Sequence, residues 1–257
     1  MGHDRISLAP WFTDYRLRQQ GQVRVFAFPY SGSGALAYFP WAKAWREYGT
    51  AVDFLGVQLP GRESRLREAC ITAMPLLVEQ LLQAMMPLLD KPFVFFGHSL
   101  GALVAFEVCR GLRQQGLPLP RHLFVSAFRA PDLPNPNPPM SQLPEAGLIA
   151  GLRHYGGTPE AVLENADLRE LLLPIVRADF TLHETYQYRD AVPLPCPLTA
   201  FTGADDTFVT PEYMAGWHKQ TSEVFEQVVC PGGHFFLHEQ MADISRRLQN
   251  AIQVTKG

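Results

Sequence analysis

Short apolar runs recur along the chain, separated by stretches in which apolar residues return every three or four positions. Short, nearly unbroken apolar runs are typical of strands covered on both faces of a parallel sheet, and the longer spacing is typical of amphipathic helices. The predicted strands are 23–28, 51–58, 93–97, 122–127, 197–202 and 224–229. The predicted helices are 36–47, 74–89, 100–114, 211–219 and 239–252. Because strand and helix alternate, the pattern predicts an α/β fold with a mainly parallel central sheet flanked by helices.

One segment interrupts this alternation. Residues 131–144 contain six prolines, which continue neither a helix nor a sheet. Residues 145–190 then add further helical patterns, at 145–154, 159–164, 167–173 and 175–188. Because strand-like segments lie on both sides, we interpret about 131–190 as a helical lid inserted before the strand at 197–202, not as a linker between domains. We therefore expect residues 1–257 to form a single domain.

Composition narrows the class of protein. Hydrophobic residues make up 47% of the 257 residues and charged residues 18%, which is typical of a globular chain. The net charge of −3, without a long basic block, argues against a partner made of nucleic acid. No apolar stretch reaches the length of about 18 residues that a membrane span needs, and the polar opening is unlike a secretory signal. We expect a cytoplasmic protein without a membrane partner.

The cysteines fit the same expectation. They are widely spaced and include no C-x-x-C pair, so the sequence predicts isolated reduced thiols and neither a disulfide framework nor a metal site. The four positions are Cys70, Cys109, Cys196 and Cys230.

The pentapeptide Gly-His-Ser-Leu-Gly at 97–101 is the strongest chemical signal in the chain. It directly follows the apolar run Phe-Val-Phe-Phe and precedes a good helical pattern. A strand that ends at a serine flanked by glycines two residues away is typical of a nucleophile held on a sharp turn between strand and helix. Gly97 and Gly101 lack the side chains that would collide there. We interpret Ser99 as a catalytic nucleophile.

A serine nucleophile needs a base, and the base needs an acid that orients it. In this fold class the chain order is Ser, then Asp or Glu, then His. His234 follows the strand at 224–229 on a glycine loop, and we expect it to be the base in preference to His98 or His238. Asp205 and Asp206 both follow the strand at 197–202. The spacing favours Asp206 only weakly, so Asp205 stays open.

The oxyanion of an acyl-transfer intermediate needs two backbone donors. We expect one from the N–H of Leu100, directly after the nucleophile, and the other from the N–H of Ser31 in the loop after the first strand. The glycines of that loop also raise the possibility of a phosphate site. The segment lacks the full G-x-G-x-x-G spacing and a following G-K-[ST], so we do not expect a nucleotide there.

Several motifs together resemble the type II thioesterases, stand-alone α/β-hydrolases that serve nonribosomal peptide and polyketide synthases. The resemblance covers about residues 22–250. It rests on Phe-Pro-Tyr-Ser-Gly, Gln-Leu-Pro-Gly-Arg-Glu at 58–63, Gly-His-Ser-Leu-Gly, Arg-Ala-Pro at 129–131, the lid segment 156–188 with Gly-Gly-Thr-Pro and Arg-Ala-Asp-Phe, Gly-Ala-Asp-Asp at 203–206 and Gly-Gly-His-Phe at 232–235. The chain departs from the family where Ser-Gly-Ser-Gly at 31–34 replaces the commoner Ala-Gly-Gly, and where Thr207 replaces a common proline.

The resemblance implies an α/β-hydrolase fold and a thioester hydrolase with the catalytic triad Ser99, Asp206 and His234. Leu100 and Ser31 match the family's oxyanion positions. Such enzymes remove stalled or aberrant acyl groups from the phosphopantetheine arm of carrier proteins, through an acyl-serine intermediate. The resemblance therefore implies acyl- or peptidyl-carrier domains as partners and no bound cofactor, because the substrate carries the phosphopantetheine. We expect a monomer.

Other readings of the same motifs stay open. A medium-chain fatty acyl thioesterase, or an esterase of small esters, would use the same triad. A catalytically idle module that only binds carriers would have no need of all three residues. For the arginines in loops, two interpretations stay open, contact with the acidic carrier or the phosphate of its arm, and simple solvation: Arg62, Arg65, Arg67 and Arg129. For the aromatic residues of the lid, two interpretations also stay open, lining of an acyl tunnel and packing within the lid: Tyr155, Phe180, Tyr186 and Tyr188.

Overall fold

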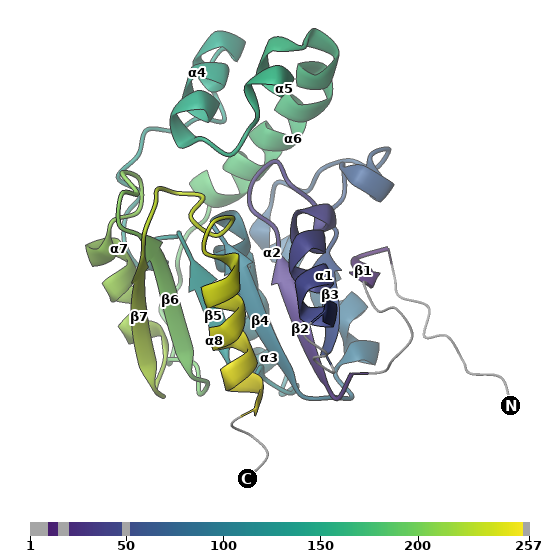
Figure 1. The fold of residues 1–257 in the computed structure, drawn as a ribbon, viewed down its shortest axis with the longest axis vertical. Helices are drawn as coiled ribbons and strands as arrows, with labels where there is room; N and C mark the ends of the chain where they lie inside the picture. The colour runs from purple at the N-terminus through teal and green to yellow at the C-terminus, as the bar shows by residue number, and fades with distance from the viewer. Residues whose placement is uncertain (1–9, 15–20, 48–51, 254–257) are drawn as a thin grey trace, which may run out of the picture.

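A computed structural model describes residues 10–14, 21–47 and 52–253 of the chain. In this part of the chain, seven strands form one sheet in the order β1-β3-β2-β4-β5-β6-β7 (Figure 1). The strands are β1 (Phe12–Asp14), β2 (Val23–Phe28), β3 (Val52–Val57), β4 (Phe93–His98), β5 (Leu123–Ser126), β6 (Leu198–Gly203) and β7 (Phe225–Cys230). Neighbouring strands from β3 to β7 pair in parallel, which confirms the predicted mainly parallel sheet.

The sequence pattern missed β1. This strand of three residues pairs antiparallel with β3, and Phe12 lies opposite Val57. A strand this short leaves no alternation that can be read from the sequence, so only its pairing with β3 reveals it. Residue 51, the first of a predicted strand, lies outside the described residues.

Helices cover both faces of the sheet (Figure 1). They are α1 (Phe39–Glu47), preceded by a 3₁₀ turn over Ala35–Tyr38, α2 (Met74–Met85), α3 (Leu100–Gln114), α7 (Pro211–Ala215) and α8 (Met241–Gln253). The side chains of α2 and α3 pack on one face, and those of α1 and α8 on the other. Each face therefore has its own apolar cluster, as expected for strands that are buried on both sides.

The alternation of β4 shows how one strand serves both clusters. Phe93 and Phe95 point to the α2–α3 side, where their rings lie 5.7 Å from the ring of Phe26. Phe96 points to the α1–α8 side, where its ring lies 5.0 Å from that of Trp41. Both faces of β4 are thus filled with aromatic rings, and the strand is held firmly up to its end at His98, directly before Ser99.

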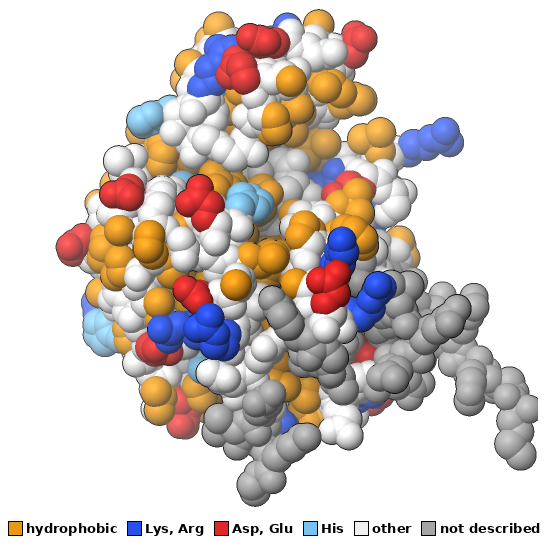
Figure 2. All heavy atoms as spheres, viewed as in Figure 1, with side chains coloured by type: hydrophobic (Ala, Val, Ile, Leu, Met, Phe, Trp, Pro, Cys, Tyr) orange, Lys and Arg blue, Asp and Glu red, His pale blue; other side chains and the backbone are white. Residues whose placement is uncertain are grey.

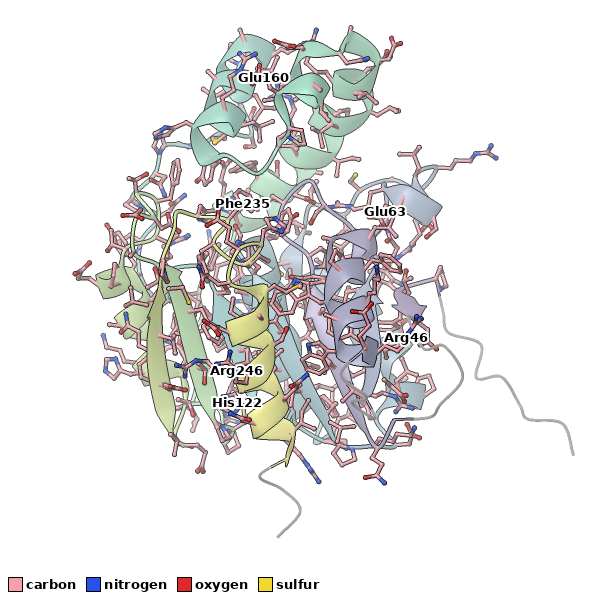
Figure 3. The ribbon with its side chains drawn as sticks, viewed as in Figure 1. Arg46, Glu63, His122, Glu160, Phe235 and Arg246 are labelled. Atoms are coloured by element: carbon pink, nitrogen blue, oxygen red, sulfur yellow. The ribbon has the colours of Figure 1, made fainter. Side chains whose placement is uncertain are left out.

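The lid helices are α4 (Glu145–Tyr155), α5 (Glu160–Glu164) and α6 (Ala166–Glu184), between β5 and β6 in the chain. They lie beyond the carboxyl ends of the parallel strands (Figure 1). The lid has a small apolar cluster of its own, which includes Leu148, Leu163 and Val176. Figure 3 shows Glu160 on the outer side of the lid and Phe235 between the lid and the sheet.

Helix α6 corrects one detail of the prediction. The sequence pattern predicts separate helical segments at 167–173 and 175–188, but α6 runs through Pro174 and ends at Glu184. A proline inside a helix removes one backbone hydrogen bond. Leu173, Ile175 and Val176 beside it are all buried, so apolar packing offsets this loss.

The surface, the thiols and the charged side chains test further expectations from the sequence. In the described part of the chain, no helix is long and apolar enough to cross a bilayer. The four cysteines are free thiols, as predicted. Figure 2 shows acidic and basic side chains interspersed on the visible face, without a broad basic patch. No group of His, Cys, Asp and Glu residues in the described ranges is arranged to hold a metal ion.

Candidate active site

Ser99 lies on a sharp turn between β4 and α3. Its backbone has φ 52° and ψ −124°, in a region that residues other than glycine rarely adopt. The turn is closed by tight backbone contacts: a Cβ on Gly97 would lie 2.2 Å from the carbonyl oxygen of Gly101. A Cβ on Gly101 would lie 2.1 Å from the carbonyl oxygen of Phe28. This is the strand–turn–helix geometry that exposes a serine hydroxyl above a parallel sheet.

The structure brings together the three residues predicted to form the triad. Nε2 of His234 lies 3.2 Å from Oγ of Ser99, and Nδ1 of His234 lies 2.8 Å from Oδ2 of Asp206. Asp206 and His234 are 5% and 6% exposed, so water does not compete strongly for these hydrogen bonds. Residues separated by 28 and 135 positions thus form one hydrogen-bonded relay.

The geometry also decides between the two aspartates. Oδ1 of Asp206 accepts hydrogen bonds from the N–H groups of Phe208 and Val209, at 2.8 and 3.0 Å. These bonds orient the carboxylate so that Oδ2 faces His234. Asp205 is exposed, and its backbone N–H donates to the carbonyl of Gly232 on the loop that leads to His234. Asp206 is therefore the partner of the imidazole, and Asp205 helps to join the two loops.

Two backbone N–H groups are available for an oxyanion beside Ser99. Leu100 is the first residue of α3, and the first N–H groups of a helix have no partner within it. Ser31 lines the same cavity as Ser99. In the described ranges, the N–H of Ser31 has no hydrogen-bond partner, whereas the next two N–H groups donate to Asp179 and Tyr30.

The cavity above Ser99 lies between the lid and the sheet and has a volume of about 60 Å³. Of the four lid aromatics for which the sequence left tunnel lining or packing open, Tyr155 and Phe180 line the cavity. Tyr186 and Tyr188 instead donate hydrogen bonds to Glu107 and Gln220 outside the cavity. The prediction missed further aromatic residues of the lining, because they come from loops without periodicity: Tyr30, Phe128, Phe208 and Phe235.

Buried titratable groups surround the triad. Burial lowers the pKa of His98 well below its usual value, and His98 therefore stays neutral with Nδ1 2.9 Å from Oγ of Ser126. Its ring centroid lies 5.5 Å from that of His234. Burial, together with the charge of Asp206, raises the pKa of Tyr155 to about 12, so its hydroxyl stays protonated. The triad thus has neutral polar neighbours and no competing charge on these two sides.

The four loop arginines considered for carrier binding lie in three different surroundings. Arg62 and Arg65 are buried and engage Asp179 and Glu68, so they are not available to a partner protein. Arg129 lines the cavity; its Nε donates to the carbonyl of Leu133, and burial lowers its pKa. Arg67 is exposed.

The comparisons with known proteins agree with this geometry. The family model of the thioesterase domain matches residues 23–252. The chain belongs to the thioesterase family. It is 39% identical over 229 residues to the gramicidin S biosynthesis protein GrsT of Aneurinibacillus migulanus, covering 89% of this chain and 88% of that protein. It is also 38% identical over 256 residues to a Brevibacillus parabrevis protein named linear gramicidin dehydrogenase LgrE, covering 98% and 96% of the two chains.

A solved structure extends the likeness to three dimensions. The type II thioesterase BorB from the borrelidin biosynthetic cluster superimposes with a TM-score of 0.87 and 33% sequence identity, over 95% of this chain and 98% of that chain. The predicted α/β-hydrolase fold and the predicted thioesterase family are thereby confirmed. The chain is a thioester hydrolase.

Proposed function

We propose that this thioesterase hydrolyses acyl thioesters from the phosphopantetheine arm of carrier proteins and so removes stalled or aberrant acyl groups from nonribosomal peptide or polyketide synthases. The observation that carries the proposal is the relay from Asp206 through His234 to Ser99, at 2.8 and 3.2 Å, beneath a helical lid. The relatives add the biosynthetic setting, since GrsT and BorB are both named for antibiotic or natural-product pathways.

The reaction has two half-reactions on the same residues. In the first, His234 takes the proton of Ser99 as Oγ attacks the thioester carbonyl, and it then gives that proton to the departing thiol. In the second, His234 takes a proton from water as the water attacks the acyl-serine carbonyl, and it gives that proton to Oγ of Ser99 as the C–Oγ bond breaks and the acid is released. Asp206 holds the tautomer of His234 and stabilises the imidazolium. The N–H groups of Leu100 and Ser31 donate to the oxyanion in both halves.

The name of LgrE raises the question of a dehydrogenase, but the loop after β2 does not suit a dinucleotide site. A dinucleotide site needs free backbone N–H groups to receive the pyrophosphate. Here the N–H groups of Gly32 and Leu36 donate to the carboxylates of Asp179 and Glu63. These carboxylates occupy the donors and would repel a pyrophosphate.

The size of the cavity points to small acyl groups. An engineered cavity of about 150 Å³ holds benzene, and the cavity above Ser99 has about 60 Å³. We therefore expect acetyl and other acyl groups of a few carbons to be hydrolysed faster than an octanoyl group. The opposite order would favour the medium-chain fatty acyl alternative.

Mass spectrometry of acyl-loaded carrier proteins, before and after treatment with the enzyme, tests the proposal. Carriers loaded with acetyl, aminoacyl and octanoyl groups should return to the free thiol form, and Ser99→Ala should lower turnover by roughly 10⁴- to 10⁶-fold. Acyl-CoA and nitrophenyl esters are assayed in parallel, and fluorophosphonate labels the active serine.

Each alternative predicts a different result. A strong preference for nitrophenyl esters over loaded carriers would indicate a small-ester esterase. A wild-type protein that fluorophosphonate does not label would indicate an idle carrier-binding module. Normal hydrolysis by Ser99→Ala would remove Ser99 from the mechanism.

A further inference from the structure

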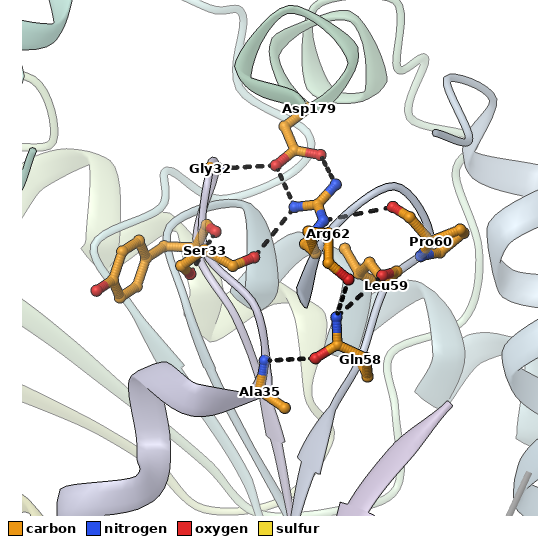
Figure 4. A network of polar contacts seen from close by, with 9 residues as sticks. Gly32, Ser33, Ala35, Gln58, Leu59, Pro60, Arg62 and Asp179 are labelled. Atoms are coloured by element: carbon orange, nitrogen blue, oxygen red, sulfur yellow. Dashed lines mark hydrogen bonds and ion pairs between the residues drawn. The ribbon is translucent and has the colours of Figure 1, made fainter. Parts of the chain in front are cut away.

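Two sequence motifs have no part in the triad. They are Gln-Leu-Pro-Gly-Arg-Glu at 58–63 and Arg-Ala-Asp-Phe at 177–180. The first follows β3, and the second lies within the lid helix α6. Figure 4 shows that both motifs reach the loop of residues 30–36, which carries Ser31. They therefore hold the loop that we assign to the oxyanion site.

The lid contributes the carboxylate of Asp179. This side chain is fully buried, and its Oδ2 accepts a hydrogen bond of 2.8 Å from the N–H of Gly32. Gly32 directly follows Ser31. Because a peptide unit is planar, a bond to the N–H of Gly32 fixes the orientation of the peptide that joins these two residues. The Ser31 N–H belongs to the preceding peptide, and the hydrogen bond of 3.1 Å from the Ser33 N–H to the Tyr30 carbonyl closes the turn on that side, so Ser31 is held from both directions.

Arg62 completes this contact from the side of the sheet. Its Nη1 and Nη2 donate to Oδ2 and Oδ1 of Asp179 at 2.6 and 2.7 Å, in a bidentate pair (Figure 4). Nη1 also donates to the carbonyl oxygen of Ser33 at 3.1 Å. Arg62 thus neutralises the buried carboxylate and fixes the loop on the other side of Gly32.

Two other residues of the motif that contains Arg62 hold the rest of the loop. Oε1 of Gln58 accepts from the N–H of Ala35 at 3.1 Å, and its Nε2 donates to the carbonyl of Arg62 at 2.9 Å. The carboxylate of Glu63 accepts from the N–H of Leu36 at 3.2 and 3.3 Å. The part of the loop after Gly32 is therefore tied to the core, whereas Gly32 itself is tied to the lid.

We propose that Asp179 is a positioning residue of the hydrolysis, which couples the seating of the lid to the orientation of the Ser31 N–H. The inference rests on the proposed role of Ser31 in stabilising the oxyanion. When α6 is seated on the sheet, Asp179 and Arg62 hold the loop so that Ser31 donates towards Ser99. When α6 moves away, Gly32 loses its acceptor and the second oxyanion donor loses its orientation.

The test compares two substitutions of Asp179. The concentration of active sites in each protein is first determined by titration to completion with a fluorophosphonate, so that rates are compared per active site. Asp179→Ala should lower kcat by about 100-fold, within the range for loss of one oxyanion donor, with KM changed less than about 3-fold. Asp179→Asn keeps an acceptor oxygen for Gly32, so its loss should be only about 10-fold. A trifluoromethyl ketone forms a tetrahedral oxyanion on the serine. In each variant, the affinity for this ketone should fall by the same factor as kcat.

A matched control removes a different ion pair of the lid. Arg153 and Glu160 pair on the outer surface of the lid, and both are about half exposed. Arg153→Gln should leave kcat and the affinity for the ketone within about 2-fold of wild type.

A second variant covers the case in which a single substitution prevents folding. Arg62→Leu combined with Asp179→Leu removes both buried charges, so no unpaired charge remains. This double variant should still lose kcat, because Gly32 has no acceptor. Full kcat per titrated site in the double variant, or in Asp179→Ala, would overturn the proposal.

All variants are assayed on both a nitrophenyl ester and an acyl-carrier. A wild type that acts only on the ester would contradict the carrier proposal and leave this test intact.

Discussion

The nucleophile turn and the oxyanion loop lie next to each other in the active site, but the chain holds them by different means. The turn at Ser99 is held by backbone groups: the close approach of Gly97 and Gly101, the carbonyl of Phe28 against Gly101, and the hydrogen bond of 2.8 Å from the Ser99 N–H to the Ser126 carbonyl. The loop that carries Ser31 is held by side chains from distant positions, and Asp179 is 147 residues from Gly32. Steric contacts of the backbone fix the first, and hydrogen bonds to buried polar groups fix the second.

This difference indicates which of the two regions is coupled to the lid. The nucleophile turn has no hydrogen bond to α6 in the described ranges, whereas the oxyanion loop is bonded to it through Asp179. On the proposal above, a motion of the lid acts directly on the loop that carries Ser31 and only indirectly on Ser99.

Apart from loss of Ser99 itself, the largest effect is expected at the acid of the triad. The N–H groups of Phe208 and Val209 hold one oxygen of residue 206, so Asp206→Asn would turn its amide NH₂ towards Nδ1 of His234 and favour the wrong tautomer. We expect kcat to fall by about 10³- to 10⁴-fold, measured on an acyl-carrier. Asp205→Asn is the matched control and should stay within about 2-fold. Equal losses in both variants would show that Asp206 is not the specific partner of His234.

The next effect tests whether steric contacts hold the nucleophile turn. A Cβ at residue 101 would lie 2.1 Å from the carbonyl oxygen of Phe28, which the backbone can relieve only by moving. Gly101→Ala should lower the free energy of unfolding by about 3 kcal/mol, measured by urea denaturation. A Cβ at Gly147 in the lid helix α4 meets Leu143 at an ordinary 3.4 Å. Gly147→Ala should be neutral or stabilising by up to about 1 kcal/mol. A Gly101→Ala protein as stable as wild type would contradict the steric account.

The smallest effect compares histidines of the two regions in acid. Burial lowers the pKa of His98, on β4, well below its usual value, and burial together with the charge of Arg129 lowers the pKa of His183, on α6, to about 3. The unfolded chain binds protons at these sites below about pH 6.5, where the native protein does not. The free energy of unfolding should therefore fall as the pH falls below about 6.5, by at most about 1.4 kcal/mol per pH unit for each histidine.

Substitution separates the two contributions. His183→Asn should make the dependence of unfolding free energy on pH less steep between pH 6.5 and about 4, measured by urea denaturation at several pH values. His218→Asn, at an exposed position, serves as the control and should leave the slope unchanged. A slope that His183→Asn does not alter would mean that the lid histidine does not limit stability in acid.

The sequence predicted those features whose signals are local. Strands such as 23–28 and 93–97 are apolar runs, so their positions matched the structure closely. The turn around Ser99 could be predicted because its glycines, its strand and its helix are all adjacent in the chain. The strand β1 and the continuity of α6 through Pro174 were missed, because pairing with β3 and packing of the lid decide them.

The sequence by itself determined the order of strands and helices, the sharp turn at Ser99 and membership of the thioesterase family. Only the tertiary structure decided that Asp206 and not Asp205 faces His234, and that Arg62 binds Asp179 instead of a carrier protein. The physical reason is the range of the interactions. Hydrophobic periodicity and turn sterics act between residues close in the chain, whereas a buried hydrogen bond depends on where distant segments meet after the sheet and the lid have packed.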